Sequence, residues 1–135
     1  MTGIEPIAYL IARICTCGIW VGAGLFKATH FEKTVAEMGG HFGIPLPRLV
    51  LPVVLFMELA GSALLIANYY VWLVCLAWSV FLFPATVLYH GTVIKPDGTL
   101  DFVQYVMVSK NISILGGLII LTLLDPSRPA WLLRG

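Results

Sequence analysis

The amino-acid sequence predicts an all-α integral membrane protein: a bundle of four transmembrane helices, with a short interfacial helix between the first and the second. Composition points there first, because 59% of the 135 residues are hydrophobic and only 11% are charged, whereas soluble domains carry about 25% charged residues. The apolar residues also gather in four runs of about 20, the length that crosses a hydrocarbon core of about 30 Å. We expect one domain, residues 1–135, with helices spanning about 6–28, 47–67, 69–90 and 102–124.

The first run has to be distinguished from a cleaved signal peptide. It has no positively charged n-region before it, it is longer than the apolar core of a signal peptide, and it contains Arg13. We therefore expect residues 6–28 to remain in the protein as a membrane helix.

The segment between the first two runs predicts a short helix in the membrane interface. Thr29 and Glu32 have the spacing of a capping box, a hydroxyl and a carboxylate three residues apart. Apolar residues then recur at helical spacing, at Phe31, Val35 and Met38, before a pair of glycines. An amphipathic helix of this kind lies in the plane of the interface. An irregular loop is the alternative.

The other two links are shorter than the first and unequal. Asn68 and Tyr69 leave almost no loop between the second and third helices, which predicts a tight antiparallel pair. In residues 91–101, Pro96, Asp97 and Gly98 predict a turn. Four crossings place both termini on one side of the membrane. The distribution of Lys and Arg slightly favours a topology in which the first and third links face the cytoplasm.

The cysteines predict neither a disulfide nor an iron–sulfur cluster. Cys15 and Cys17 point about 200° apart on one helix, and Cys75 is alone on another. All three are interpreted as small apolar fillers.

The histidines predict no haem, because bis-histidine ligation needs two inward histidines at matching depth on facing helices. His30 and His41 lie in the first link, and His90 lies at a helix end. We expect no structural metal either. A metal site made by His90 with the histidines of the link is the alternative that stays open.

Ionisable residues inside the membrane are costly and usually mark function. The candidates are Arg13, Lys27, Glu58, His90 and Lys110. Arg13 and Lys27 share one helix face with residues 17, 20 and 24, although Lys27 could simply extend to the membrane surface. Gly18 and Gly22 form a GxxxG pair on another flank, which favours close helix packing.

The third and fourth helices carry polar stripes. The stripe of the third helix comprises Trp72, Ser79, Thr86 and His90, with a kink expected at Pro84. The fourth helix has two neighbouring stripes, one with Lys110, Ser113 and Gly117 and the other with Gln104, Asn111 and Thr122. These stripes predict which faces turn toward the interior of the bundle.

Five segments in order resemble the DoxX family of small four-helix membrane proteins. They are Gly22–Lys27 with Arg13 before it, Gly43–Pro47, Glu58–Gly61, Ala85–His90 and Lys110–Gly117. The resemblance implies an association with membrane redox systems. One branch of the family belongs to thiosulfate:quinone oxidoreductases, and others accompany thiol and oxidative-stress enzymes. This sequence has no CxxC pair and no second, periplasmic domain, which argues against direct thiosulfate or dithiol chemistry.

Three functions are compatible with the sequence. The first is a subunit of a quinone-linked redox system, in which Arg13, Glu58, His90 and Lys110 bind the quinone head and manage its protons. The second is an accessory subunit of a larger membrane complex, without chemistry of its own. The third is a small transporter, although four-helix exporters rely on a glutamate in the first helix, where this chain has Arg13.

The expected surroundings are a lipid bilayer, in the inner (plasma) membrane of a bacterium or archaeon, and other membrane subunits. The formal net charge of +1 gives no reason to expect nucleic acid as a partner. A quinone is the expected cofactor, and whether the chain is itself an enzyme stays open.

Depth along the helices predicts that Glu58, Arg13 and Lys110 form a buried ionic cluster as the functional centre. Counted from the side of the long links, they lie about 14, 20 and 12 Å deep, respectively. Long basic side chains could close such gaps. One acid against two bases leaves an unmatched positive group, which favours a bound electron-rich ligand.

Overall fold

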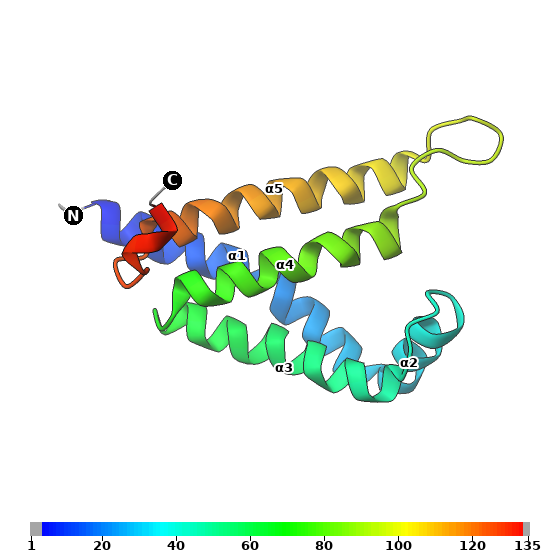
Figure 1. Cartoon of the computed structure of the whole chain (residues 1–135), viewed down its shortest axis with the longest axis horizontal. Helices are drawn as coiled ribbons and strands as arrows, with labels where there is room; N and C mark the ends of the chain where they lie inside the picture. The colour runs from blue at the N-terminus through cyan, green and yellow to red at the C-terminus, as the bar shows by residue number, and fades with distance from the viewer. Residues whose placement is uncertain (1–3, 134–135) are drawn as a thin grey trace. The chain divides into compact units, whose positions relative to one another are not determined.

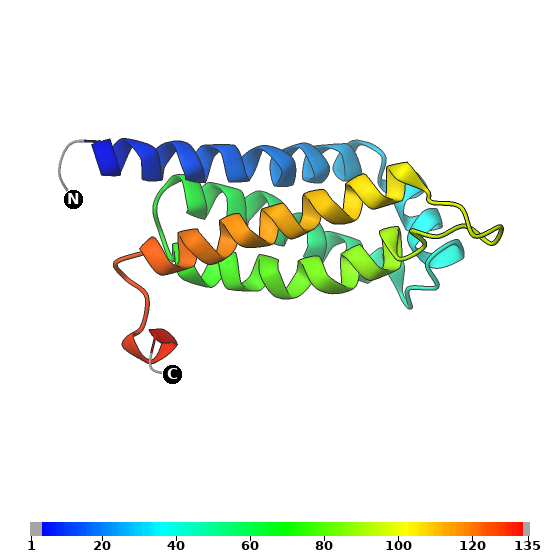
Figure 2. The same cartoon turned by 90° about the horizontal axis from the view of Figure 1, so that it is seen from above.

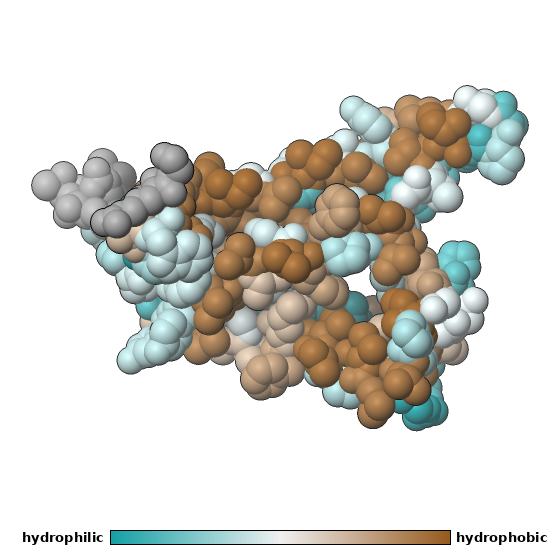
Figure 3. All heavy atoms as spheres, in the orientation of Figure 1, coloured by the Kyte–Doolittle hydropathy of each residue, from teal (hydrophilic) through white to brown (hydrophobic). Residues whose placement is uncertain are grey.

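The computed structural model describes residues 4–133. Its helices are α1 (Ile4–Thr29), α2 (Phe31–Gly40), α3 (Pro47–Ile66), α4 (Val71–His90), α5 (Phe102–Leu124) and a short 3-10 helix, η1 (Ala130–Leu133). Among the described residues, four helices, α1, α3, α4 and α5, are long and apolar enough to cross a membrane. The predicted fold class is confirmed, and apolar side chains make up much of the face shown in Figure 3.

The chain divides into two compact units, Met1–Val71 and Trp72–Gly135. The first contains α1, α2 and α3, with α1 running antiparallel to α3 (Figure 1). The second contains α4, α5 and η1, with α5 running back along α4 (Figure 2). The Lys27–Glu58 pair described below lies within the first unit.

The short helix predicted between the first two runs is present as α2, but its predicted capping box is not. Thr29 belongs to α1 and donates its hydroxyl to the carbonyls of Leu25 and Phe26, while His30 is the N-cap of α2 without a side-chain bond. Glu32 instead accepts from the guanidinium of Arg48, at 2.6 and 3.0 Å. A bidentate pair with arginine satisfies this carboxylate better than a single backbone N–H does.

The link between α3 and α4 is longer than predicted. Asn68 and Tyr70 adopt the left-handed backbone conformation, with φ of 62° and 49°. Since such residues cannot continue a right-handed helix, α4 begins at Val71 and not at residue 69.

The link between α4 and α5 contains the predicted turn. Gly98 has a φ of 81°, and Asp97 accepts hydrogen bonds from the hydroxyl and the backbone N–H of Thr99. These hydrogen bonds hold the pKa of Asp97 below its usual value. The turn leads into Asp101, which caps α5 by accepting from the backbone N–H groups of Val103 and Gln104.

Polar contacts join α4 and α5 at both ends and between them. The Thr86 hydroxyl accepts from the Asn111 amide at 2.8 Å, and Nδ1 of His90 lies 2.9 Å from Oε1 of Gln104. At the other end, the backbone N–H of Trp72 donates to Asp125 at 2.8 Å. The polar stripe of α4 therefore meets the α5 stripe that carries residues 104 and 111.

The sequence analysis overlooked Asp125, a residue that is only 3% exposed. One oxygen accepts from Trp72, at an α4 terminus that has no helical partner for its N–H groups, and the other accepts from the backbone and hydroxyl of Ser127. We expect Asp125→Ala to destabilise the α4–α5 pair by about 1–3 kcal/mol, because buried donors lose their acceptor. Unfolding titrations in mixed detergent would measure this. Asp97→Ala, in the exposed turn, is the control, and equal losses for the two variants would contradict the assigned role.

The four spans make a topological prediction. Lys33 and Lys95 should be labelled from one side of the membrane, and Gly135, which lies outside the described residues, from the other. Single cysteines at these positions, treated with a membrane-impermeant reagent in sealed vesicles, would measure the sidedness. Labelling of positions 33 and 135 from the same side would refute a four-span topology.

Candidate functional site

One face of α1 makes a series of polar contacts with α3. Arg13 donates from Nη1 to the carbonyls of Leu65 and Ile66, at 3.1 and 3.3 Å. One turn further along, the Cys17 thiol lies 3.5 Å from the carbonyl of Ser62. This confirms that the residues spaced by fours and threes from position 13 share a face, and it shows that the partner of that face is α3.

Gly24 lies in the same face, and the two helices touch there. A Cβ atom at this position would lie 2.8 Å from Cδ2 and 3.0 Å from Cγ of Leu59. In contrast, Gly18 and Gly22 have no atom within 4 Å of such a Cβ. The close-packing glycine of α1 is therefore Gly24, and the GxxxG pair predicted for that role does not fill it in this structure.

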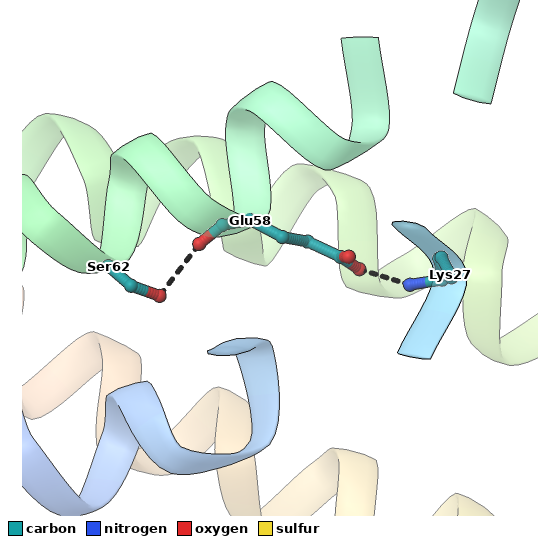
Figure 4. A network of polar contacts seen from close by, with 3 residues as sticks. All are labelled: Lys27, Glu58 and Ser62. Atoms are coloured by element: carbon teal, nitrogen blue, oxygen red, sulfur yellow. Dashed lines mark hydrogen bonds and ion pairs between the residues drawn. The ribbon is translucent and has the colours of Figure 1, made fainter. Parts of the chain in front are cut away.

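At the end of this face, the ammonium of Lys27 forms an ion pair with Oε1 of Glu58 (Figure 4). The Glu58 side chain is 2% exposed and the Lys27 side chain 24%. Ser62 also points toward Glu58, but its hydroxyl donates to the backbone carbonyl, at 2.6 Å, and not to the carboxylate (Figure 4). The pair is thus closed on the side of α3 and partly open at Lys27.

The two oxygens of the Glu58 carboxylate differ. Oε1 accepts from Lys27, whereas Oε2 is buried and has no hydrogen-bond partner among the described residues. An ionised carboxylate has about four lone-pair sites, so a capacity to accept is left unused. A buried acceptor without a donor is costly, so its presence in a native structure calls for an explanation, of which a catalytic role is one.

This arrangement contradicts the predicted contact between Arg13 and Glu58. Arg13 and Lys27 are 14 residues apart on α1, about 21 Å along the helix axis, which is too far for both to reach one carboxylate. Arg13 instead binds the final carbonyls of α3, which carry partial negative charge, and lies 4.8 Å from the centre of the Tyr9 ring. The positive charge of Arg13 is therefore balanced partly by the negative end of the α3 dipole and not by a carboxylate.

The remaining predicted site residues, His90 and Lys110, belong to the second unit. Because Oε1 of Gln104 can only accept, Nδ1 of His90 carries the proton in their contact, and Nε2 is left to act as acceptor or donor. Nζ of Lys110 lies 3.5 Å from the sulfur of Met107. Within the described part of the chain, no three His, Cys, Asp or Glu side chains are grouped to hold a metal ion.

The structure thus brings together Glu58 with Lys27, a candidate residue for which the sequence left open whether it faces the bundle or extends to the membrane surface. The signal was present in its spacing from Arg13, which puts it on the inward face. What was missing was the register between α1 and α3. That register brings residue 27 opposite residue 58.

The chain is similar in sequence to two inner membrane proteins of Escherichia coli (strain K12). The inner membrane protein YphA of Escherichia coli (strain K12) is 28% identical over 124 residues, which span 90% of this chain and 86% of YphA. The inner membrane protein YqjF of the same organism is 25% identical over 126 residues, spanning 93% of this chain and 90% of YqjF. No solved structure matches the chain. The DoxX family model matches residues 8–91, more than half of the sequence, and the chain therefore belongs to the DoxX family.

Proposed function

We propose that the chain is a membrane subunit of a quinone-linked redox system, in which the Lys27–Glu58 pair binds the polar head of a quinone or relays its protons. The observation that supports this most is Glu58 itself, a carboxylate 2% exposed in a membrane helix, with one oxygen paired and the other free of donors among the described residues. Ionisable groups inside membrane helices are costly and rare, and they commonly mark ion or substrate pathways. The relatives are inner membrane proteins by name, and we propose the same location for this chain.

The two members of the pair suit different tasks. An ammonium has three N–H donors, and Lys27 uses one on Glu58, so others can donate to a carbonyl. Its partial exposure makes it the accessible side of the pair. Oε2 of Glu58 is enclosed by the protein. It therefore suits the uptake of a proton, which needs little space, better than contact with the quinone ring.

A bound quinone would supply the two-electron, two-proton chemistry, while these residues orient its head and hold a proton. Arg13 acts in this proposal as a positioning residue, because it ties α1 to the end of α3 and so sets the register that aligns the pair. His90 and Lys110, in the second unit, are proposed as further proton-handling groups.

A second candidate function, an accessory subunit without chemistry, has support from the same contacts. The bonds from Arg13 and Cys17 to α3 are structural, and the Lys27–Glu58 pair extends this series. If the pair only holds α1 against α3, the direction of its charges is unimportant.

Exchanging the charges separates the two candidates. The double variant Lys27→Glu/Glu58→Lys keeps an ion pair but reverses donor and acceptor. If the pair handles a quinone, we expect near-normal abundance in the membrane with loss of the quinone that co-purifies in mild detergent, measured per mole of protein. The exposed pair offers a matched control, Glu32→Arg/Arg48→Glu, which should change neither quantity.

Two outcomes would overturn the redox proposal. The first is a wild-type protein that retains no quinone after gentle purification from native membranes. The second is a charge-exchanged variant that retains as much as the wild type, a result that would favour the accessory role.

A further inference from the structure

Lys110 carries a charge inside a membrane-spanning helix. It is the ninth of the 23 residues of α5, so its backbone lies about 12 Å from the beginning of the helix. Helical side chains lean toward the N-terminus, and Nζ of Lys110 reaches back to Met107, whose sulfur lies 3.5 Å away. The ammonium therefore stays roughly 8 Å inside the span, where a lysine is costly unless it meets a partner.

No counter-charge balances this ammonium among the residues that the structure describes. The ion pairs of that range, described above, do not include Lys110. The sulfur of Met107 is uncharged and only a weak acceptor. The half-buried Lys110 side chain thus has an unfilled requirement for a negative group.

The chain itself has little to offer as that negative group. It contains seven Asp and Glu residues, and only Glu58 lies inside one of the four spans. Glu58 already accepts from Lys27, and its other oxygen is enclosed. A second copy of the chain would bring the same set of charges and one more unpaired lysine. A lipid phosphate stays at the membrane surface, so we expect a carboxylate from a different protein.

The face of α5 that carries Lys110 is open to such a partner. Ser113 and Gly117 lie on the same side of the helix as Lys110. Ser113 is about 200° round the helix axis from Asn111, which contacts α4. Its side chain is exposed and bonds to its own helix, and a Cβ atom at Gly117 would meet no neighbouring atom within 4 Å. Small residues of this kind allow two membrane helices to approach closely.

We propose that Lys110, Ser113 and Gly117 form a docking surface for a membrane helix of another protein, one that carries an Asp or Glu side chain facing Lys110. Charge complementarity selects this partner, because an acidic group inside a membrane is costly as well and each charge lowers the cost of the other. The proposal goes beyond the function proposed for Lys27 and Glu58 and does not need it. A carboxylate would also give Lys110, as a proton-handling group, the acceptor that it lacks.

Synthetic membrane helices test the surface directly. Leucine-rich peptides of the same length as α5 carry Glu, Gln or Lys at the depth of Lys110, and their binding to the full chain in lipid vesicles is measured by energy transfer between fluorescent labels. We expect the Glu peptide to bind about tenfold more tightly than the Gln peptide, and the Lys peptide to bind least. Lys110→Leu should abolish this preference, and Lys110→Glu should reverse it. Lys95→Leu, in the link before α5, is the control and should change nothing.

A photoactivatable amino acid in place of Val106, an exposed residue one turn before Lys110, identifies the natural partner in native membranes. Mass spectrometry should find it joined to a membrane-spanning segment of another protein that contains Asp or Glu. The yield should fall at least tenfold with Lys110→Leu and persist with Lys110→Arg. Cross-links only to lipid, to a second copy of this chain or to a helix without an acidic residue would contradict the proposal, as would equal binding of the three peptides. None of these readouts depends on quinone retention, which tests the proposed function.

Discussion

Replacing Glu58 with alanine is expected to cost about 3–5 kcal/mol of stability, because it leaves the Lys27 ammonium without its counter-charge in a largely buried position. Glu58→Gln should cost less, since the amide oxygen still accepts from Lys27. The measurements are the free energy of unfolding in mixed detergent and the amount of protein in membranes.

Two comparisons make this result specific. Glu32→Ala breaks the exposed pair with Arg48. Because the Glu32 side chain is 69% exposed and the Arg48 side chain 66%, this variant should lose less than about 1 kcal/mol of stability. The double variant Lys27→Met/Glu58→Leu removes both charges and should regain most of the loss, as apolar replacements of buried pairs do. If Glu58→Ala were no more harmful than Glu32→Ala, the pair would be weaker than its burial indicates.

Gly24→Leu is expected to have the second largest effect, because α1 and α3 are in contact at this position. The Cβ atom alone would come within 2.8 Å of Leu59, and a leucine side chain would force the helices apart and misalign Lys27 with Glu58. Overpacking of this kind costs about 1–3 kcal/mol or more. Unfolding titrations would show the loss of stability.

The glycines of α1 provide the controls. Gly24→Ala should be milder than Gly24→Leu, because the atom in its way is the end of a flexible leucine side chain. Gly18→Leu should be close to neutral, since the space around Gly18 is open. A larger loss at position 18 than at position 24 would show that the GxxxG pair is the true packing face.

Much of the fold could be predicted because it depends on local physics. The long apolar runs require membrane helices, and the amphipathic segment 31–40 requires a short helix between the first two. The errors were local as well. The capping box failed because Glu32 found a better partner in Arg48, and the start of α4 moved because Asn68 and Tyr70 turn the backbone the other way.

The candidate site was predicted only in part. Glu58 and the inward face of Arg13 and Lys27 were identified from residue type and spacing, and the facing stripes of α4 and α5 were found in the same way. Asp125 was missed, because its role depends on the backbone N–H of Trp72, which lies 53 residues earlier in the chain.

The sequence by itself thus determined that this protein lies in a membrane, where its helices are, and which of their faces are polar. Hydrophobicity and helical periodicity act over a few turns, and one chain displays them directly. Only the tertiary structure decided that Glu58 pairs with Lys27 and that Arg13 binds the end of α3. The physical reason is that a partner is chosen by the register between two helices. That register depends on where backbones can approach, as at Gly24, and on which buried group finds a counter-charge within reach.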